Sequence, residues 1–84
     1  MRYGMCAICG QYGDMDRHHV FGGTARQISE RYGAVIDVCR GCHRSIHDHR
    51  SAYAWLQAKT QTKVMFEQGW DLDEWMAHFH RNYL

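Results

Sequence analysis

The sequence lacks proline, a long apolar run and a strong net charge. None of its 84 residues is proline and its glycines are scattered, so we expect one domain without a flexible linker. No stretch approaches the roughly 20 apolar residues that a membrane-spanning helix requires, which excludes a membrane partner. Because no apolar run follows the first residues either, we expect no secretory signal and a cytoplasmic location.

So short a chain has few side chains with which to build a core, and such domains usually need disulfides, metal or a partner. The sequence contains four cysteines and seven histidines. In the reducing cytoplasm, cysteine clusters indicate metal sites more often than disulfides. We therefore expect metal to stabilise the fold, with disulfides or free core thiols as the alternative.

The cysteines form two C-x-x-C pairs, Cys6 with Cys9 and Cys39 with Cys42. A separation of about 30 residues between such pairs is a strong signal for tetrahedral zinc held by four thiolates. Four protein ligands leave no open position on the ion, so this zinc would be structural. Glycine follows the first pair, as in a zinc knuckle whose backbone amides point at the sulfurs.

The histidines form a second group. His43 and His47 are four residues apart on an expected helix and share one of its faces, where two imidazoles can bind one metal ion. His18 and His19 are adjacent on an expected strand and can serve one groove only if the strand is twisted or irregular there. We expect His18 to share the ion with His43 and His47. His19 would stand beside the ion, unligated.

Apolar patterns and chain breakers predict a small α+β fold. The expected elements are a cysteine knuckle over residues 1–13, a turn at 14–16, a strand at 17–21, a weak helix at 24–32, a strand at 34–38 and a helix from about 40 to 49. Thr24 would cap the weak helix, and Gly33 would end it.

The remaining residues, 51–84, are expected to form two helices. Ser51 could cap the first, which would end at Gly69. Asp71 and Glu74 have the capping-box spacing and would begin the second. All three tryptophans lie in this tail, which indicates core packing or a subunit interface, so the C-terminal helices could pair two chains in a homodimer.

The formal net charge of +1 does not by itself indicate a nucleic-acid partner. Residues 1–50, however, carry seven basic residues against five acidic ones, and all seven are arginine. Arginine suits bidentate phosphate binding better than lysine does. Arg17, Arg26 and Arg44 are therefore candidates for binding DNA phosphates, with an ordinary solvated surface as the alternative.

The runs D-R-H-H-V-F-G-G and S-E-R-Y-G-A-V-I-D-V-C-R-G-C-H-R-S-I-H resemble the HNH endonucleases of ββα-metal (His-Me finger) fold. The small versions carried by phages and prophages are especially similar. The resemblance covers roughly residues 3–50 and implies a zinc-stabilised nuclease core over residues 1–50. Residues 51–84 would then be a helical extension, packed on the core or at a dimer interface, in a phage- or prophage-encoded protein of a bacterial cell.

The resemblance also implies roles for single residues. His19 would be the general base, and His18, His43 and His47 would hold one catalytic divalent ion (Mg²⁺, Mn²⁺, Ni²⁺ or Zn²⁺), apart from the structural zinc on the cysteines. The implied activity is metal-dependent hydrolysis of DNA that leaves 5′-phosphate and 3′-hydroxyl ends. An imidazole with an ordinary pKa of about 6.5 can accept a proton from water at neutral pH.

The chain departs from the family at one position. Many members have an asparagine near the second strand that fixes the loop bearing the base. Gly33 and Ala34 occupy that neighbourhood here, and Asp37 is the nearest polar side chain. Either another group orients His19, or hydrolysis is weaker than in typical members. The alternative functions are a non-catalytic zinc module that binds DNA or a protein, and a zinc-stabilised oligomerisation piece.

Overall fold

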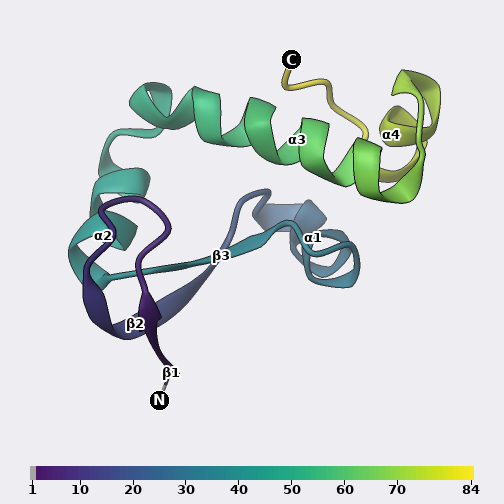
Figure 1. The fold of residues 1–84 in the computed structure, drawn as a ribbon. Coiled ribbons are helices and arrows are strands. Elements are labelled where there is room, and N and C mark those ends of the chain that lie inside the picture. The colour runs from purple at the N-terminus through teal and green to yellow at the C-terminus, as the bar shows by residue number, and fades with distance from the viewer. Residues whose placement is uncertain (1) are drawn as a thin grey trace.

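The computed structural model describes residues 2–84 and has an α+β architecture, as expected from the sequence (Figure 1). Within this range the regular elements are β1 (Arg2–Met5), β2 (Tyr12–His19), α1 (Arg26–Arg31), β3 (Val35–Val38), α2 (Arg40–Asp48), α3 (Ala54–Gln68) and α4 (Leu72–Phe79). Short 3₁₀ turns at Gly23–Ala25 and Arg50–Tyr53 precede α1 and α3. No helix of the described range has the length and apolarity needed to span a membrane.

The three strands form one antiparallel sheet with β2 in the middle. The first half of β2 pairs with β1, and its second half pairs with β3, so that His19 lies opposite Val35. The predicted turn at 14–16 is wrong because these residues lie inside β2, and the strand predicted at 17–21 runs from Tyr12 to His19. The chain already reverses in the cysteine knuckle, where the Cys6 amide donates to the Gln11 carbonyl at 2.8 Å.

Several predicted helix ends are confirmed. Gly33 follows α1 with φ +75° and Gly69 follows α3 with φ +69°, in the left-handed region that favours glycine. The Asp71 carboxylate accepts from the Glu74 amide at 2.9 Å and caps α4. The helix expected from about 40 to 49 is α2, which ends at Asp48.

Two predicted caps are wrong. Thr24 lies within the 3₁₀ turn, and the residue that precedes α1 is Ala25, which makes no side-chain cap. Ser51 likewise lies in a 3₁₀ turn, and α3 begins after Tyr53. In both cases the chain enters the helix through a tight helical turn, so the capping signal comes too early in the sequence.

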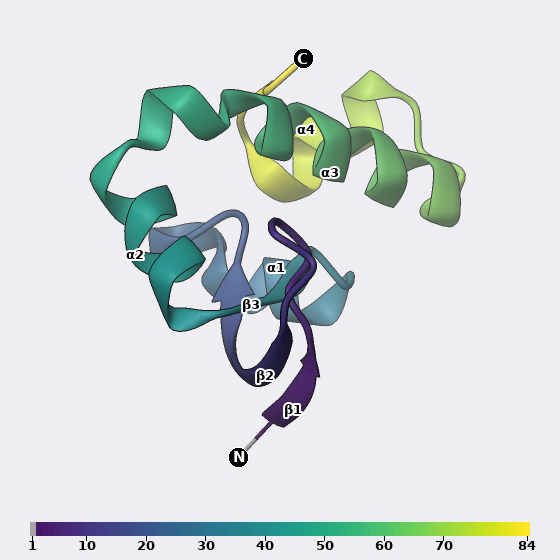
Figure 2. The same cartoon turned by 60° about the vertical axis from the view of Figure 1, so that its left-hand side comes forward.

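The tail helices α3 and α4 lie over the rest of the domain in both views (Figures 1 and 2). The ring of Phe21, just after β2, packs against Trp75 and Phe79 of α4 at centroid distances of 5.4 and 5.3 Å. Phe21 and Trp75 are almost completely buried. The tail therefore supplies core to the part of the chain that carries the histidines, which confirms core packing for one of the three tryptophans.

The last residues return from α4 alongside α3 (Figure 1). Gln61 of α3 is fully buried, and its side chain accepts from the Tyr83 amide at 2.7 Å and donates to the Asn82 side chain at 2.9 Å. The Trp75 indole donates to the Arg81 carbonyl at 2.8 Å. These bonds hold the C-terminal segment in a defined position against α3 and α4.

Candidate metal centres

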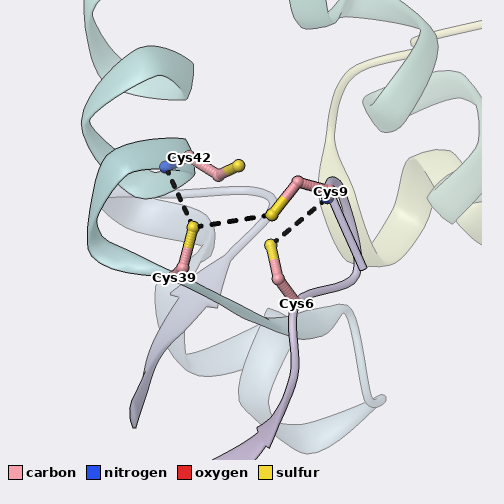
Figure 3. A group of neighbouring side chains, drawn as sticks. All are labelled: Cys6, Cys9, Cys39 and Cys42. Carbon is pink, nitrogen blue, oxygen red and sulfur yellow. Dashed lines mark hydrogen bonds between the residues drawn. The ribbon is translucent and has the colours of Figure 1, made fainter. Parts of the chain in front are cut away.

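The four cysteines lie together, although they come from two distant parts of the chain (Figure 3). Cys6 and Cys9 lie in the loop between β1 and β2, whereas Cys39 caps α2 and Cys42 lies in its first turn. All four sulfurs are within 4.8 Å of one another. The Cys9 and Cys39 sulfurs are 3.8 Å apart, which matches the separation of about 3.8 Å that tetrahedral zinc with Zn–S bonds of roughly 2.3 Å requires.

Backbone amides point at the sulfurs, as the knuckle pattern predicts. The Cys6 sulfur accepts from the amides of Ile8 at 3.4 Å and Cys9 at 3.5 Å, and the Cys39 sulfur accepts from the Cys42 amide at 3.5 Å. Burial opposes ionisation of Cys6, but backbone amides, chiefly that of Cys9, lower its pKa to about 6. Burial and the neighbouring thiols raise the pKa of Cys42 to about 12.

The two pKa shifts have different causes, since backbone amides favour the Cys6 thiolate whereas burial and the neighbouring thiols oppose ionisation of Cys42. Four thiolates in one small volume would also repel one another. A divalent cation at the centre removes that repulsion and lets all four sulfurs act as ligands. The cysteine cluster could therefore hold a structural metal ion, and its distances and donor set fit zinc.

Three histidines form the second cluster, with their ligand nitrogens within 4.8 Å of one another. The Nε2 atoms of His43 and His47 are 3.2 Å apart, close to the roughly 3.3 Å expected for two imidazoles on one tetrahedral ion. His18 reaches them from β2 and is buried. Burial, and then repulsion from His43 and His47, lower the pKa of His18 to about 4, so it is neutral and able to ligate at neutral pH.

Asp16 fixes the proton on one of these rings. Its carboxylate lies 3.1 Å from Nδ1 of His43. The hydrogen bond from His43, and then the charge of Arg40, lower the pKa of Asp16 against the opposing effect of burial. An ionised carboxylate only accepts, so Nδ1 carries the proton and Nε2 of His43 presents a lone pair to its neighbours.

His19 lies outside the three-nitrogen cluster. The two faces of β2 are kept apart, with Asp16 and His18 contacting α2. On the other face, the Nε2 atom of His19 lies 2.7 Å from a carboxylate oxygen of Glu30 in α1. Arg17 binds the same carboxylate in a bidentate manner, at 2.6 and 3.1 Å.

The Glu30 carboxylate, which is paired with Arg17, sets the tautomer of His19. The hydrogen bonds from Arg17, and then from His19, lower the pKa of Glu30 and keep it ionised. Because that carboxylate can only accept, Nε2 of His19 carries a proton, and the neutral ring has its lone pair on Nδ1. His19 thus has its Nε2 atom held by Glu30, and no hydrogen bond to its Nδ1 atom is found within residues 2–84.

The histidines of both faces meet at one cavity of about 320 Å³ at the end of β2. His18, His19 and His47 line it together with Gly22 and Gly23, which follow the strand. His18 and His19 therefore lie on opposite faces of β2, as successive strand residues do. They still border a common cavity because the strand ends at His19. The group of three nitrogens that could hold an ion does not include His19.

The three arginines expected to bind phosphate have different surroundings. Arg26 lines a second cavity with His43, whereas Arg17 is paired with Glu30 at its edge. Arg44 is exposed on α2 and lines neither of the two cavities found in the described range. Sequence reasoning missed Asp16 and Glu30. Asp16 could have been found, since it lies two residues before His18 and shares its strand face.

The two clusters differ in what they can do chemically. A four-cysteine set closes the coordination shell, whereas three imidazoles leave a position for water or substrate on a tetrahedral ion. Comparison of the chain with protein-family profiles, curated proteins and solved structures finds no match. The assignment of function therefore rests on the geometry of these clusters.

Replacing one cysteine ligand should unfold the domain. In Cys39→Ser the cluster loses a thiolate ligand, whereas the serine hydroxyl can still cap α2, so we expect loss of bound zinc and, for want of the metal, of the cooperative thermal transition. Circular dichroism melting and metal analysis of purified protein measure both effects. A strong chelator added to the wild type should reproduce the loss.

His43→Ala is the matched comparison, because it removes a candidate metal ligand from the same helix without touching the cysteines. It should retain one zinc ion per chain and a melting transition close to that of the wild type. Equal destabilisation of the two variants would show that the cysteine cluster is not the structural site.

Proposed function

We propose that this protein is a metal-dependent DNA endonuclease of the HNH type, with β2, β3 and α2 as its ββα-metal core. One observation carries the proposal. A cluster of three imidazoles and the separate imidazole of His19, whose Nε2 atom is held by Glu30, all line the second cavity. The first group suits a divalent ion with an open position, and the second suits proton transfer next to it.

His18, His43 and His47 would hold the catalytic ion. Bound there, a divalent ion would supply charge neutralisation at a phosphate oxygen and at the departing 3′ oxygen. Imidazole ligands suit Zn²⁺ and Ni²⁺ more than Mg²⁺, although Mn²⁺ and Mg²⁺ are also within the chemistry of the site.

His19 acts as the general base in this proposal. Its Nδ1 atom accepts a proton from a water molecule while the water oxygen forms a bond to phosphorus. The bond from phosphorus to the 3′ oxygen breaks, and that oxygen takes a proton from solvent. The products are a 5′-phosphate and a 3′-hydroxyl, and His19 then returns its proton to solvent.

Glu30 takes the orienting role for which the sequence offers no asparagine. Its carboxylate fixes the His19 ring through Nε2 and is itself fixed by Arg17. A carboxylate on the far nitrogen of a base also stabilises the imidazolium that forms when the base takes a proton. Glu30 is a positioning residue, because it acts through His19.

DNA cleavage by His19 variants tests the proposal. Supercoiled plasmid and single-stranded and branched DNA are incubated with the zinc-loaded protein and added Mn²⁺, Ni²⁺ or Mg²⁺. Loss of the base should lower the cleavage rate of His19→Ala by roughly 10²–10⁴-fold with retained melting temperature. If wild type and variant bind DNA but neither cleaves any substrate, the protein is a zinc-dependent binding module.

Removal of the orienting carboxylate should reduce turnover more than binding. We expect Glu30→Ala to lower kcat roughly 10–100-fold with little change in KM, because misplaced catalytic groups affect the chemical step. Glu30→Gln keeps an acceptor oxygen and should recover part of the rate. Glu67→Ala removes a carboxylate that pairs with Lys63 on α3 and should leave kcat unchanged. A purely structural role for Glu30 would lower kcat in proportion to the folded fraction and would not be rescued by glutamine.

Asp16 should control metal affinity at the histidine cluster. We expect Asp16→Ala to weaken binding of a second Zn²⁺ or Ni²⁺ roughly 10–100-fold, because His43 loses the partner that sets its tautomer. Asp14→Ala is the control, since Asp14 is an exposed residue of the same strand. Isothermal titration of the metal into protein that already holds one zinc measures the affinity of each variant. If Asp16→Ala binds the second metal ion as tightly as the wild type does, Asp16 has no role in metal binding at the histidines.

A further inference from the structure

The cavity at the histidines extends to the C-terminal segment. Besides His18 and His47, its lining includes Arg50, which follows α2, and Arg81 and Tyr83 at the end of the chain. The second cavity shares His18, His19 and Arg50 with the first and continues to Arg26. The two cavities therefore form one track, which passes the histidines between Arg26 and Arg81.

Among the side chains that line the track, those of fixed charge are all arginines. No aspartate or glutamate lines either cavity in residues 2–84. Within that range Arg26, Arg50 and Arg81 make no ion pair with a carboxylate, in contrast to Arg17, which is held by Glu30. Unpaired guanidinium groups that border one groove attract an anionic ligand and can donate to phosphate oxygens.

Arg81 is held in place, although it is only three residues from the end of the chain. Its carbonyl accepts from Trp75, and its guanidinium carbon lies 5.2 Å from the ring centroid of Tyr83. The Tyr83 ring packs on Phe21 at 4.6 Å, and its amide is bound by buried Gln61. A guanidinium positioned by its neighbours loses less entropy on binding a phosphate than a mobile one does.

We infer that Arg81, together with Arg50, binds a backbone phosphate of a DNA strand next to the phosphate at the histidines. The C-terminal segment is then part of the nucleic-acid interface. The inference rests on the proposed function in that the ligand at the histidines is a phosphodiester. The placing of the arginines favours a strand over a single anion, because Arg26 lines only the second cavity and Arg81 only the first, so that separate phosphates could occupy both.

Binding of a labelled single-stranded oligonucleotide tests the inference. Fluorescence anisotropy is measured on zinc-loaded protein without a second metal, so no turnover occurs. Arg81→Ala should bind about tenfold more weakly, and the slope of log Kd against log salt should fall by about 0.7. Arg81→Lys keeps the charge but not the bidentate geometry, so its affinity for the oligonucleotide should lie between those of the wild type and Arg81→Ala.

Arg31→Ala is the matched control. Arg31 also lies over a tyrosine ring, that of Tyr32 at 5.6 Å, but it lines neither cavity of the described range. Its affinity and salt slope should equal those of the wild type. Wild-type binding by Arg81→Ala, or equal loss in Arg31→Ala, would overturn the inference. Melting temperatures of all variants should agree, because alanine keeps the Arg81 carbonyl that Trp75 binds.

Two further results distinguish the ligand and the reaction. If inorganic phosphate displaces the oligonucleotide as well as an unlabelled oligonucleotide of the same phosphate concentration does, the track binds single anions and the inference of a bound strand is wrong. If the wild type cleaves no DNA yet Arg81→Ala loses affinity, hydrolysis is removed from the proposal while the interface remains.

Discussion

The close approach of the Cys6–Cys9 loop to the first turn of α2 is the constraint on which the other parts of the structure depend. Cys39 directly follows β3 and caps α2, so the same sulfur cluster fixes the direction of the strand and the start of the helix. The amide of Ala7 adds a bond to the Asp37 carbonyl of β3 at 2.9 Å. Since α2 carries His43 and His47, a shift of the cysteine cluster would separate these rings from His18 of β2.

Successive side chains of β2 point to opposite faces of the strand, so the candidate metal ligand His18 and the proposed base His19 lie on different faces. Asp16 and His18 face α2, where three imidazoles could hold an ion and the Asp16 carboxylate orients one of them, His43. Arg17 and His19 face Glu30 of α1, which fixes the tautomer of the remaining imidazole. Adjacent histidines thus receive different partners and different protonation patterns, although both border the cavity where the strand ends.

Short-range signals predicted much of the fold and of the two ligand clusters. The C-x-x-C pairs, the i, i+4 histidines, the glycine stops after α1 and α3 and the Asp71 cap each depend on a few neighbouring residues. β1 was missed because its residues are largely exposed and gain their strand conformation by pairing with β2. The contacts of His19 with Glu30 and of Gln61 with Tyr83 depend on packing across 11 and 22 residues, which no local pattern encodes.

The small net charge of the chain is compatible with a nucleic-acid partner once the positions of the charges are considered. Arg2, Arg17 and Arg40 are neutralised by Asp37, Glu30 and Asp16, and these pairs use three of the nine acidic residues. Two more acids lie in the first turn of α4, where they complement the helix dipole. Arg26, Arg50 and Arg81 line the cavities and make no such pair within residues 2–84, so unpaired positive charge gathers there although the total charge is near zero. Attraction of this kind acts within about 10 Å at ordinary ionic strength, so in the proposed nuclease the DNA strand would be attracted in the groove itself and not by long-range steering.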